Sequence, residues 1–320
     1  MTITRLASAA LALCALAVAP AAADTYPSKP VRIVVGFAAG SVSDLTARTI
    51  GQKIGAALGQ PFVVEVRPGA GSNVAALSVV RSPKDGYTLF VATSSSTIRS
   101  AASNPGFDFG TDLTPITLLA SVPFVLTAYP GLGVKTVREF IALAKAKPET
   151  LTFGGTQVGT TGYLAAALFN QRAGTNLVIA PYPSTAQATT DLMTGRISIA
   201  FSSAANVLQL IEDKKLTALA VAQPRRSAMI PNIPSIDEAG LPGVDSSIWI
   251  GMLAPAGIPR EIVDVLSKAV NEALRSEDLA RQMRLQGLEP LGGSPEDFAE
   301  RIKHDTARWD AVLKAAGLAK

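Results

Sequence analysis

The chain contains 320 residues, with 29 Lys or Arg, 25 Asp or Glu, one His and one Cys. Zinc and iron–sulfur centres use several Cys or His ligands, and a disulfide needs two Cys. This composition therefore disfavours a metal centre and excludes a disulfide within the chain. The net charge of +4 and the charged fraction of 17% are too low for the dense basic surface of a nucleic-acid-binding protein. We expect neither a metal nor a nucleic-acid partner, and the length suffices for two domains.

Residues 1–23 match the pattern of a secretory signal peptide. Arg5 precedes an apolar run over 6–19, and Ala21-Ala22-Ala23 supplies the small residues of a cleavage site. The apolar run is shorter than the about 20 residues needed to span a bilayer. The pattern predicts export through a cleavable signal peptide and a periplasmic location for the mature protein.

Strands and helices alternate in the first part of the mature chain. Residues 31–35 form a short β-branched run that predicts a buried strand. Residues 41–58 carry apolar side chains at helical spacing and end at Gly59, which predicts a helix. Further strands are predicted over 62–66 and 87–93. This order is typical of a parallel sheet with covered faces.

The alternation is predicted to continue, and the C-terminal part is predicted to be helical. Capping boxes at Thr136 and Ser184 each indicate the start of a helix. The remaining predicted elements are strands over 151–153, 177–182, 197–201 and 216–221, and helices over 160–173 and 204–214.

No Pro-, Gly- or Ser-rich linker separates the two predicted α/β lobes. The long, apolar, extended segments 116–128 and 246–254 are therefore the expected hinge crossings between the lobes. On this basis, lobe 1 comprises 24–122 together with 248–320, and lobe 2 comprises 123–247.

Sequence motifs of common enzyme classes are absent. The chain has neither a P-loop nor a G-x-S-x-G elbow, and the glycines at 36 and 40 do not match the dinucleotide fingerprint. A Ser-His-Asp triad would have to use His304, which falls almost opposite the apolar stripe of the last predicted helix. We therefore expect His304 to face solvent, and we expect no catalytic residue and no cofactor.

Four predicted loops rich in small and hydroxyl-bearing residues follow predicted strands, and three of them lead into helices. Helix N-termini attract anions because they carry unpaired N–H groups and a partial positive charge. None of the segments contains Lys or Arg, so backbone N–H groups, hydroxyls and water would hold a bound carboxylate. The candidate ligand-binding residues are Phe37, Ala38, Ala39, Gly40, Ser41 and Asp44 in the first segment, Thr93, Ser94 and Ser95 in the second, Thr156, Gly159, Thr160 and Thr161 in the third, and Ser184 and Thr185 in the fourth.

These residues also have structural interpretations. The Ser and Thr side chains are suited to ordinary helix capping, although four such segments in one exported two-lobed protein favour a ligand cleft. Asp44 stands at the third position of a helix capped by Ser41, so it either completes the cap or contacts a ligand. Tyr163 either lines the cleft or belongs to the core.

The mature chain resembles the receptors of tripartite tricarboxylate transporters, known as the Bug family. The resemblance covers essentially the whole mature chain and rests on motifs that occur in the family's order. These motifs are residues 26–35 with Gly40 and Asp44, then 67–73, 83–89, 159–160, 181–182, 191–192, 218–221, 238–243 and 254–257.

The resemblance implies an α/β, two-lobed periplasmic-binding-protein fold of type II-like topology, with each lobe a sheet flanked by helices. It implies hinge closure on a small carboxylate in the interlobe cleft, by a monomer that delivers the ligand to membrane transporter subunits. By position it adds Ser72, Asn73, Ser202 and Ser203 to the ligand-binding set. It also implies that Asp44 orients water or a ligand amine.

The chain departs from the family pattern at the expected site. Ala38-Ala39-Gly40-Ser41 stands where the family usually has prolines and paired glycines, and Ser202-Ser203 stands where it often has an Asp-Asn pair. These changes reduce polar and charged groups, which favours a smaller or more apolar acid than a tricarboxylate. The sequence thus predicts a solute-binding protein for a small organic carboxylate. A sensory receptor that signals to a membrane kinase and an exported hydrolase or lyase are the alternatives.

Overall fold

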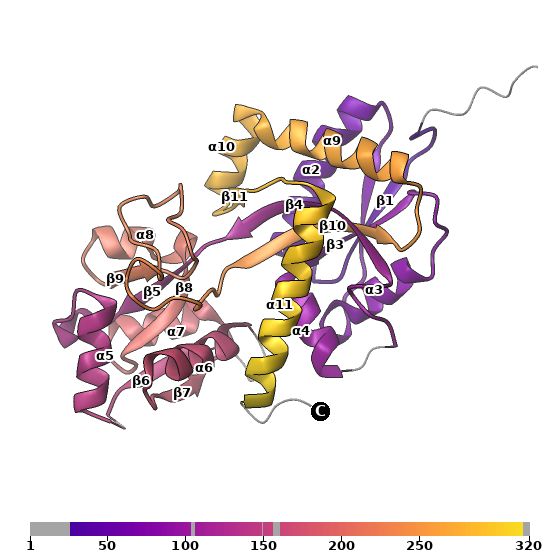
Figure 1. Ribbon diagram of the computed structural model, residues 1–320. Coiled ribbons are helices and arrows are strands. Elements are labelled where there is room, and N and C mark those ends of the chain that lie inside the picture. Colours follow the sequence, from indigo (N-terminus) through magenta and orange to yellow (C-terminus); the bar gives the residue numbers. More distant parts are fainter. Residues whose placement is uncertain (1–25, 104–105, 149, 156–160, 316–320) are drawn as a thin grey trace, which may run out of the picture.

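The computed structural model describes residues 26–103, 106–148, 150–155 and 161–315. Two β-sheets, each flanked by helices, form two lobes side by side, and long strands run between them (Figure 1). No helix in the described ranges has the length and apolarity needed to cross a bilayer. The molecule therefore consists of two layered α/β lobes joined by extended segments of chain.

The larger sheet contains six strands in the order β11-β4-β10-β3-β1-β2. Its β1, β2 and β3 are mutually parallel, whereas β10 runs antiparallel to both of its neighbours, β3 and β4. Its strands and helices are β1 (Val31–Val35), α2 (Val42–Leu58), β2 (Phe62–Val66), η2 (Ala70–Ser72), α3 (Asn73–Val80), β3 (Thr88–Thr93), α4 (Ser94–Ser103), β4 (Leu113–Val122), β10 (Ile248–Pro255), α9 (Arg260–Arg275), α10 (Glu277–Leu285), β11 (Glu289–Pro290) and α11 (Pro295–Ala315).

The smaller sheet contains five strands in the order β7-β6-β8-β5-β9. β6 is parallel to β7 and β8, and β5 is antiparallel to β8 and β9. Its elements are β5 (Phe124–Ala128), η3 (Pro130–Leu132), α5 (Val137–Ala146), β6 (Thr152–Gly155), α6 (Thr161–Ala173), β7 (Val178–Pro181), α7 (Thr185–Met193), β8 (Ile199–Ser203), α8 (Ala204–Glu212) and β9 (Thr217–Val221).

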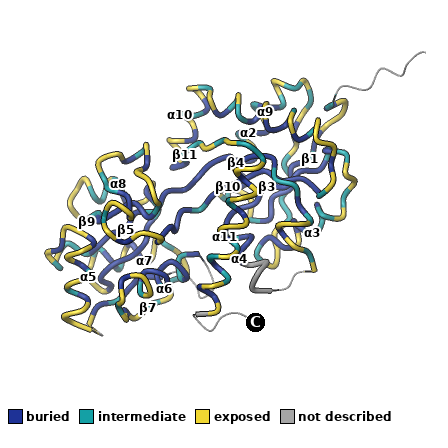
Figure 2. Tube along the Cα trace, in the orientation of Figure 1, coloured by how far each residue is buried: buried dark blue, intermediate teal, exposed yellow. Residues whose placement is uncertain are grey.

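Helices cover both faces of the larger sheet, as the continuous apolar run that forms β1 predicts. Successive side chains of a strand point to opposite faces. Accordingly, Ile33 packs with residues of α2 and α9 on one face, and Val34 packs with residues of α3 and α11 on the other. Figure 2 shows the strands of both lobes as buried chain inside a shell of half-exposed helices.

Most predicted elements are confirmed, but the loop predicted after the strand over 87–93 is wrong. β1 and β2 have their predicted limits, and α2 begins after its predicted cap, Ser41. However, the segment after β3 is not a loop, because α4 begins at Ser94 directly after Thr93. The Ser96 hydroxyl accepts a hydrogen bond from the Thr93 N–H at 3.3 Å. The Ser96 side chain, in the first turn of α4, thus pairs with the N–H of the residue that precedes the helix, so strand β3 passes directly into α4.

The chain passes between the sheets at two places. β4 of the larger sheet continues into β5 of the smaller sheet after the single residue Pro123. The return path leads from β9 through residues 222–247 into β10. In addition, α11 extends along both lobes. Its Phe298 packs in the core beside the larger sheet, whereas its Trp309 packs in the core cluster of the smaller sheet.

A cluster of four charged side chains fastens the return path to α11. Arg301 Nη2 donates to Asp245 Oδ2 at 2.9 Å, and Arg301 Nε donates to Asp305 Oδ2 at 3.0 Å. Arg308 Nη2 lies 3.1 Å from Asp305 Oδ1, and Trp249 Nε1 donates to Asp305 Oδ2 at 2.7 Å. Burial opposes the charge of Arg301, but the two carboxylates outweigh it and raise the Arg301 pKa. We call Asp245, Arg301, Asp305 and Arg308 the hinge cluster.

Candidate functional site

Four strand-to-helix connections, two from each sheet, line one cavity of about 410 Å³ between the lobes. They are β1 to α2, β3 to α4, β7 to α7 and β8 to α8. The crossing strands and the connection from α10 to β11 complete the wall. The lining residues are Phe37, Ser41, Val42, Ser43, Thr93, Ser95, Val122, Phe124, Thr185, Ser203, Ala205, Asn206, Ile248, Ile250, Gln286, Gly287 and Leu288.

The described lining of this cavity carries hydroxyls, amides and apolar side chains but no ionisable side chain. Its hydroxyls come from both lobes and stand at helix N-termini, where free N–H groups and the helix dipole favour an anion. Side chains such as Phe124, Ile248 and Ile250 form an apolar wall that suits a carbon skeleton. The arrangement can therefore bind an organic anion without a side-chain cation from the described lining.

The N-terminus of α2 is built by local hydrogen bonds. Ser41 Oγ accepts from the Asp44 N–H at 3.3 Å and lies 3.2 Å from Ser43 Oγ. Asp44 Oδ2 accepts from the Gly40 N–H at 2.8 Å, and Asp44 Oδ1 lies 2.9 Å from Arg48 Nε. Asp44 is buried and does not line the cavity. Its carboxylate thus pairs with the loop backbone on one side and with the next helical turn on the other.

The loop before α3 approaches the end of β1 very closely. A Cβ atom on Gly36 would come within 2.0 Å of Ser72 Oγ, so only glycine permits this contact. Ser72, Asn73 and Ser94 are all buried, and none of them lines the cavity. The structure therefore places these three predicted residues outside the described lining of the cavity.

In the smaller lobe, neighbouring predicted residues point in different directions. Ser184 Oγ accepts from the Gln187 N–H at 3.3 Å and caps α7, while Thr185 lines the cavity. Ser203 also lines the cavity. The hydroxyl of its neighbour Ser202 is instead buried, 3.3 Å from both Thr127 Oγ1 and Thr189 Oγ1. Strand alternation explains the difference between the two adjacent serines.

A hydrogen bond joins the two lobes beside the cavity. Ser95 Oγ on α4 lies 3.0 Å from Thr161 Oγ1 at the start of α6. Tyr163 packs, half-buried, against the core of the smaller lobe. Ala38, Ala39 and Gly40 are exposed and do not line the cavity. The predicted residues Thr156, Gly159 and Thr160 lie outside the described residues.

Several lining residues were not predicted from the sequence. Val122, Phe124, Ile248 and Ile250 belong to the crossing strands, which were read as hinges and not as cleft wall. Val42 and Ser43 lie inside the first predicted segment, between Ser41 and Asp44, but were not chosen as ligand-binding residues. Asn206 and the Gln286–Leu288 connection gave no local signal, because only the tertiary arrangement brings them to the cavity.

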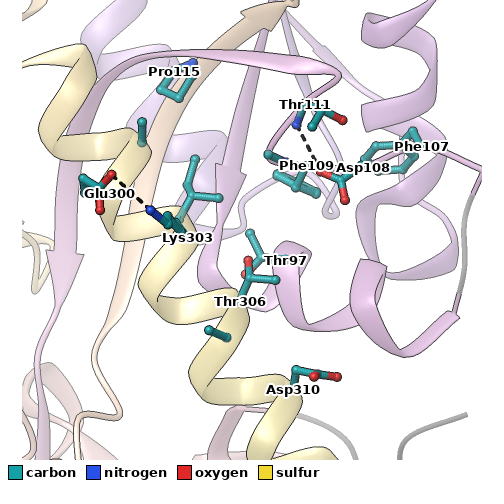
Figure 3. Close-up of a pocket in the computed structure, with 14 residues that line it drawn as sticks. Thr97, Phe107, Asp108, Phe109, Thr111, Pro115, Glu300, Lys303, Thr306 and Asp310 are labelled. Carbon is teal, nitrogen blue, oxygen red and sulfur yellow. Dashed lines mark hydrogen bonds and ion pairs between the residues drawn. The ribbon is translucent and has the colours of Figure 1, made fainter.

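A larger hollow of about 790 Å³ lies away from this cavity, between α11, α4 and the loop after α4. Figure 3 shows Lys303 directed towards Glu300 on α11, with Asp108 on the loop opposite. Asp108 Oδ1 closes its own turn by accepting from the N–H groups of Gly110 and Thr111. The described lining of this larger hollow contains no residue of the smaller sheet or its helices. The interlobe cavity, which both lobes form, is therefore the candidate ligand site.

Comparisons with known proteins agree on one family. The model of the tripartite tricarboxylate transporter family receptor matches residues 46–318. Protein BugT of Bordetella pertussis is 32% identical over 302 residues, which cover 93% of this chain and 93% of that protein. A solved R. palustris protein with adipate is 33% identical, with a TM-score of 0.71 over 92% of this chain and 99% of that chain. MatC from Rhodopseudomonas palustris with bound malate is 28% identical, with a TM-score of 0.69 over 90% of this chain and 100% of that chain.

The fold and the cavity define a two-lobed solute-binding protein of the periplasmic-binding class, as predicted. The chain belongs to the tripartite tricarboxylate transporter receptor family, which confirms the resemblance read from its motifs. Because this family consists of periplasmic substrate-binding receptors, the chain is a receptor and not an enzyme. This family assignment also gives no support to the hydrolase or lyase alternative.

Proposed function

We propose that this receptor captures a small organic carboxylate in the interlobe cavity and presents it to the membrane subunits of a tripartite transporter. The observation that carries the proposal is the convergence of helix N-termini and hydroxyls from both lobes on one cavity without a described ionisable lining residue. Free N–H groups bind the carboxylate, and the apolar wall accepts its carbon chain. The similar structures with adipate and malate support this ligand class.

In this proposal the lobes close about their two crossings. Lobe 1 comprises 24–122 with 248–320, and lobe 2 comprises 123–247. The change of sheet at Pro123 and the return through 246–254 support these limits. A ligand that contacts both lobes stabilises the closed form because it binds that form better than the open one. The last turns of α11, which pack on the smaller lobe, take part in setting the resting angle.

The ligand-binding residues in this proposal are the predicted ones that line the cavity. Phe37, Ser41, Thr93 and Ser95 act from lobe 1, and Thr185 and Ser203 act from lobe 2. The receptor acts as a monomer in the periplasm after removal of residues 1–23. The signal-like N-terminal sequence supports this step.

Calorimetric titration of residues 24–320 with mono-, di- and tricarboxylates tests the proposal. We expect binding of at least one acid, weakened about five- to tenfold by Ser41→Ala and by Thr185→Ala, since each removes one hydrogen-bonding group. Thr190→Ala is the matched control, because Thr190 is exposed on the same helix as Thr185 and does not line the cavity. A folded wild-type protein that binds none of the acids would refute the proposal.

A further inference from the structure

The connection between α10 and β11, residues 286–289, is held firmly by the larger lobe. We call it the cleft strap. Its Leu288 is buried in the core beside the larger sheet, and the Leu288 N–H donates to the Met283 carbonyl at 3.0 Å. β11 pairs with β4 at Ala120 and Ser121, immediately before the first crossing between the lobes. The cleft strap therefore moves with the larger lobe.

The side chain of Glu289, at the end of the cleft strap, crosses to the smaller lobe. Glu289 Oε1 accepts from the Ala228 N–H at 2.8 Å, and Glu289 Oε2 accepts from the Ser227 hydroxyl at 3.3 Å. Ser227 is fully buried, and its carbonyl accepts from the N–H of Ile230, which packs in a core cluster of the smaller lobe. One carboxylate of the larger lobe thus bonds two groups that the smaller lobe holds in place.

A second polar contact joins the lobes where β3 passes into α4. Ser95 Oγ on α4 lies 3.0 Å from Thr161 Oγ1 on α6, and Thr161 is buried. In the larger sheet β11 and β3 are three positions apart, so the two contacts leave the larger lobe from strands about 14 Å apart. Two contacts at this separation restrain the relative rotation of the lobes more than either one alone.

Both contacts join protein groups to each other and need no ligand. The described lining of the cavity includes neither Glu289 nor its partners Ser227 and Ala228, and it does not include Thr161. A rotation that opens the cavity separates the lobes and breaks these hydrogen bonds. A contact that exists only in the closed form stabilises that form whichever ligand is bound, and the apparent affinity scales with the closed fraction.

We propose that Glu289 and Thr161 are latches that hold the two lobes closed over the cavity without touching the ligand. This inference rests on the proposed function, in which the lobes close about their two crossings. Hydrogen bonds to a carboxylate are stronger than those between neutral groups, so Glu289 is the stronger latch. Both are positioning residues, because they act on the lobes and set how long the receptor retains any acid.

Titration calorimetry and stopped-flow measurements on residues 24–320 give affinities and dissociation rates for succinate, malate, adipate and citrate. Glu289→Ala should weaken every acid that the wild type binds by the same factor of about ten. The change should lie mostly in faster dissociation, because the ligand leaves from the open form. Glu289→Gln keeps one acceptor oxygen, and Thr161→Val removes only a hydroxyl, so each should lose about threefold.

Small-angle X-ray scattering of the ligand-free variants gives a second readout. Glu289→Ala should have a larger radius of gyration than the wild type, because loss of the latch raises the open fraction. Two matched controls should leave the affinities, the dissociation rates and the radius unchanged. Glu261→Ala removes an exposed carboxylate from α9 of the larger lobe, Thr190→Val removes an exposed hydroxyl from α7 of the smaller lobe, and neither residue lines the cavity.

The outcomes separate this inference from the proposed function. A loss confined to one acid identifies a direct ligand contact and overturns the latches, while carboxylate binding stands. The latches are also overturned if Glu289→Ala and Thr161→Val both match the wild type in dissociation rate and in radius of gyration. A wild-type protein that binds none of the acids overturns the proposed function. The scattering of the ligand-free variants then decides the latches, and an unchanged radius overturns them.

Discussion

Replacing Asp305 by Asn should strongly destabilise the protein. The Asp305 side chain is 0% exposed and is the shared partner of Arg301 and Arg308 in the hinge cluster. Asparagine preserves the shape of the side chain but removes its charge. If the amide oxygen keeps one of the hydrogen bonds, the amide N–H₂ group faces the remaining donors. Two guanidinium groups and the Trp249 N–H would then compete for a single neutral acceptor.

The size of the loss follows from the burial of the partners. Removing one partner of a buried ion pair costs about 3–5 kcal/mol. Arg301 is 31% exposed, so water partly replaces its lost partner, whereas Arg308 is only 13% exposed. We therefore expect a loss of about 3 kcal/mol, at the lower end of that range.

Urea unfolding at neutral pH measures this loss as a shift in midpoint at constant slope. Asp310→Asn is the control on the same helix, because Asp310 pairs with Lys314 at 2.6 Å but is 45% exposed. An exposed pair of this kind contributes about 0.3–0.5 kcal/mol. If Asp305→Asn cost less than about 1 kcal/mol, or no more than the control, the buried cluster would not stabilise the fold as reasoned here.

Three further predictions follow from close contacts and ionisation. Gly251→Ala should cost about 1–3 kcal/mol, because its Cβ would lie 2.1 Å from the Phe298 ring. A second substitution, Phe298→Leu, should recover part of that loss in urea unfolding, and no recovery would contradict the steric explanation. Gly287→Ala should weaken ligand binding because its Cβ meets Ala205 across the lobes, whereas Gly59→Ala, at a similar φ of 72° but in open space, should change only stability. Equal ligand affinities of the wild-type protein and Gly287→Ala in calorimetry would argue against the interlobe contact. Hydrogen bonds lower the pKa of several carboxyl groups in the folded state. Their stabilisation is therefore present above the unfolded pKa of about 4 and is lost as the pH falls through the folded pKa. The urea midpoint should be level from about pH 6 to 8 and fall below about pH 4, and a rise on acidification would contradict this. The groups and their main partners are Glu65 with Arg67, Glu238 with the Ser235 N–H, and Asp297 with Ser294.

Local signals predicted helix starts well because the groups involved lie within four residues of one another. Ser41, Thr136 and Ser184 each accept a hydrogen bond from the N–H three residues later, at 3.3, 3.2 and 3.3 Å. The same hydroxyl-rich composition gave a wrong prediction at residues 93–97. There, hydroxyl-rich sequence suggested a loop, but the hydroxyls satisfy backbone groups within the first turn of α4.

The candidate site was predictable only in part. The sequence predicted both Ser202 and Ser203 as ligand-binding residues, but only Ser203 lines the cavity. That choice depends on Thr127 and Thr189, which take the Ser202 hydroxyl into the smaller lobe. For Asp44 the sequence left a capping role and a ligand contact open, and the structure adds its contacts with Gly40 and Arg48.

By itself the sequence predicted an export signal, and it determined the α/β alternation, the two-lobed fold and the family, because each depends on short-range patterns or ordered motifs. Only the tertiary structure decided which side chains meet. Ser95 reaches Thr161, and Asp245 reaches Asp305 through Arg301, because separate chain segments pack at the junction of the lobes. Contacts between distant segments depend on how apolar faces and buried charges fit together, and no local period along the chain encodes that fit.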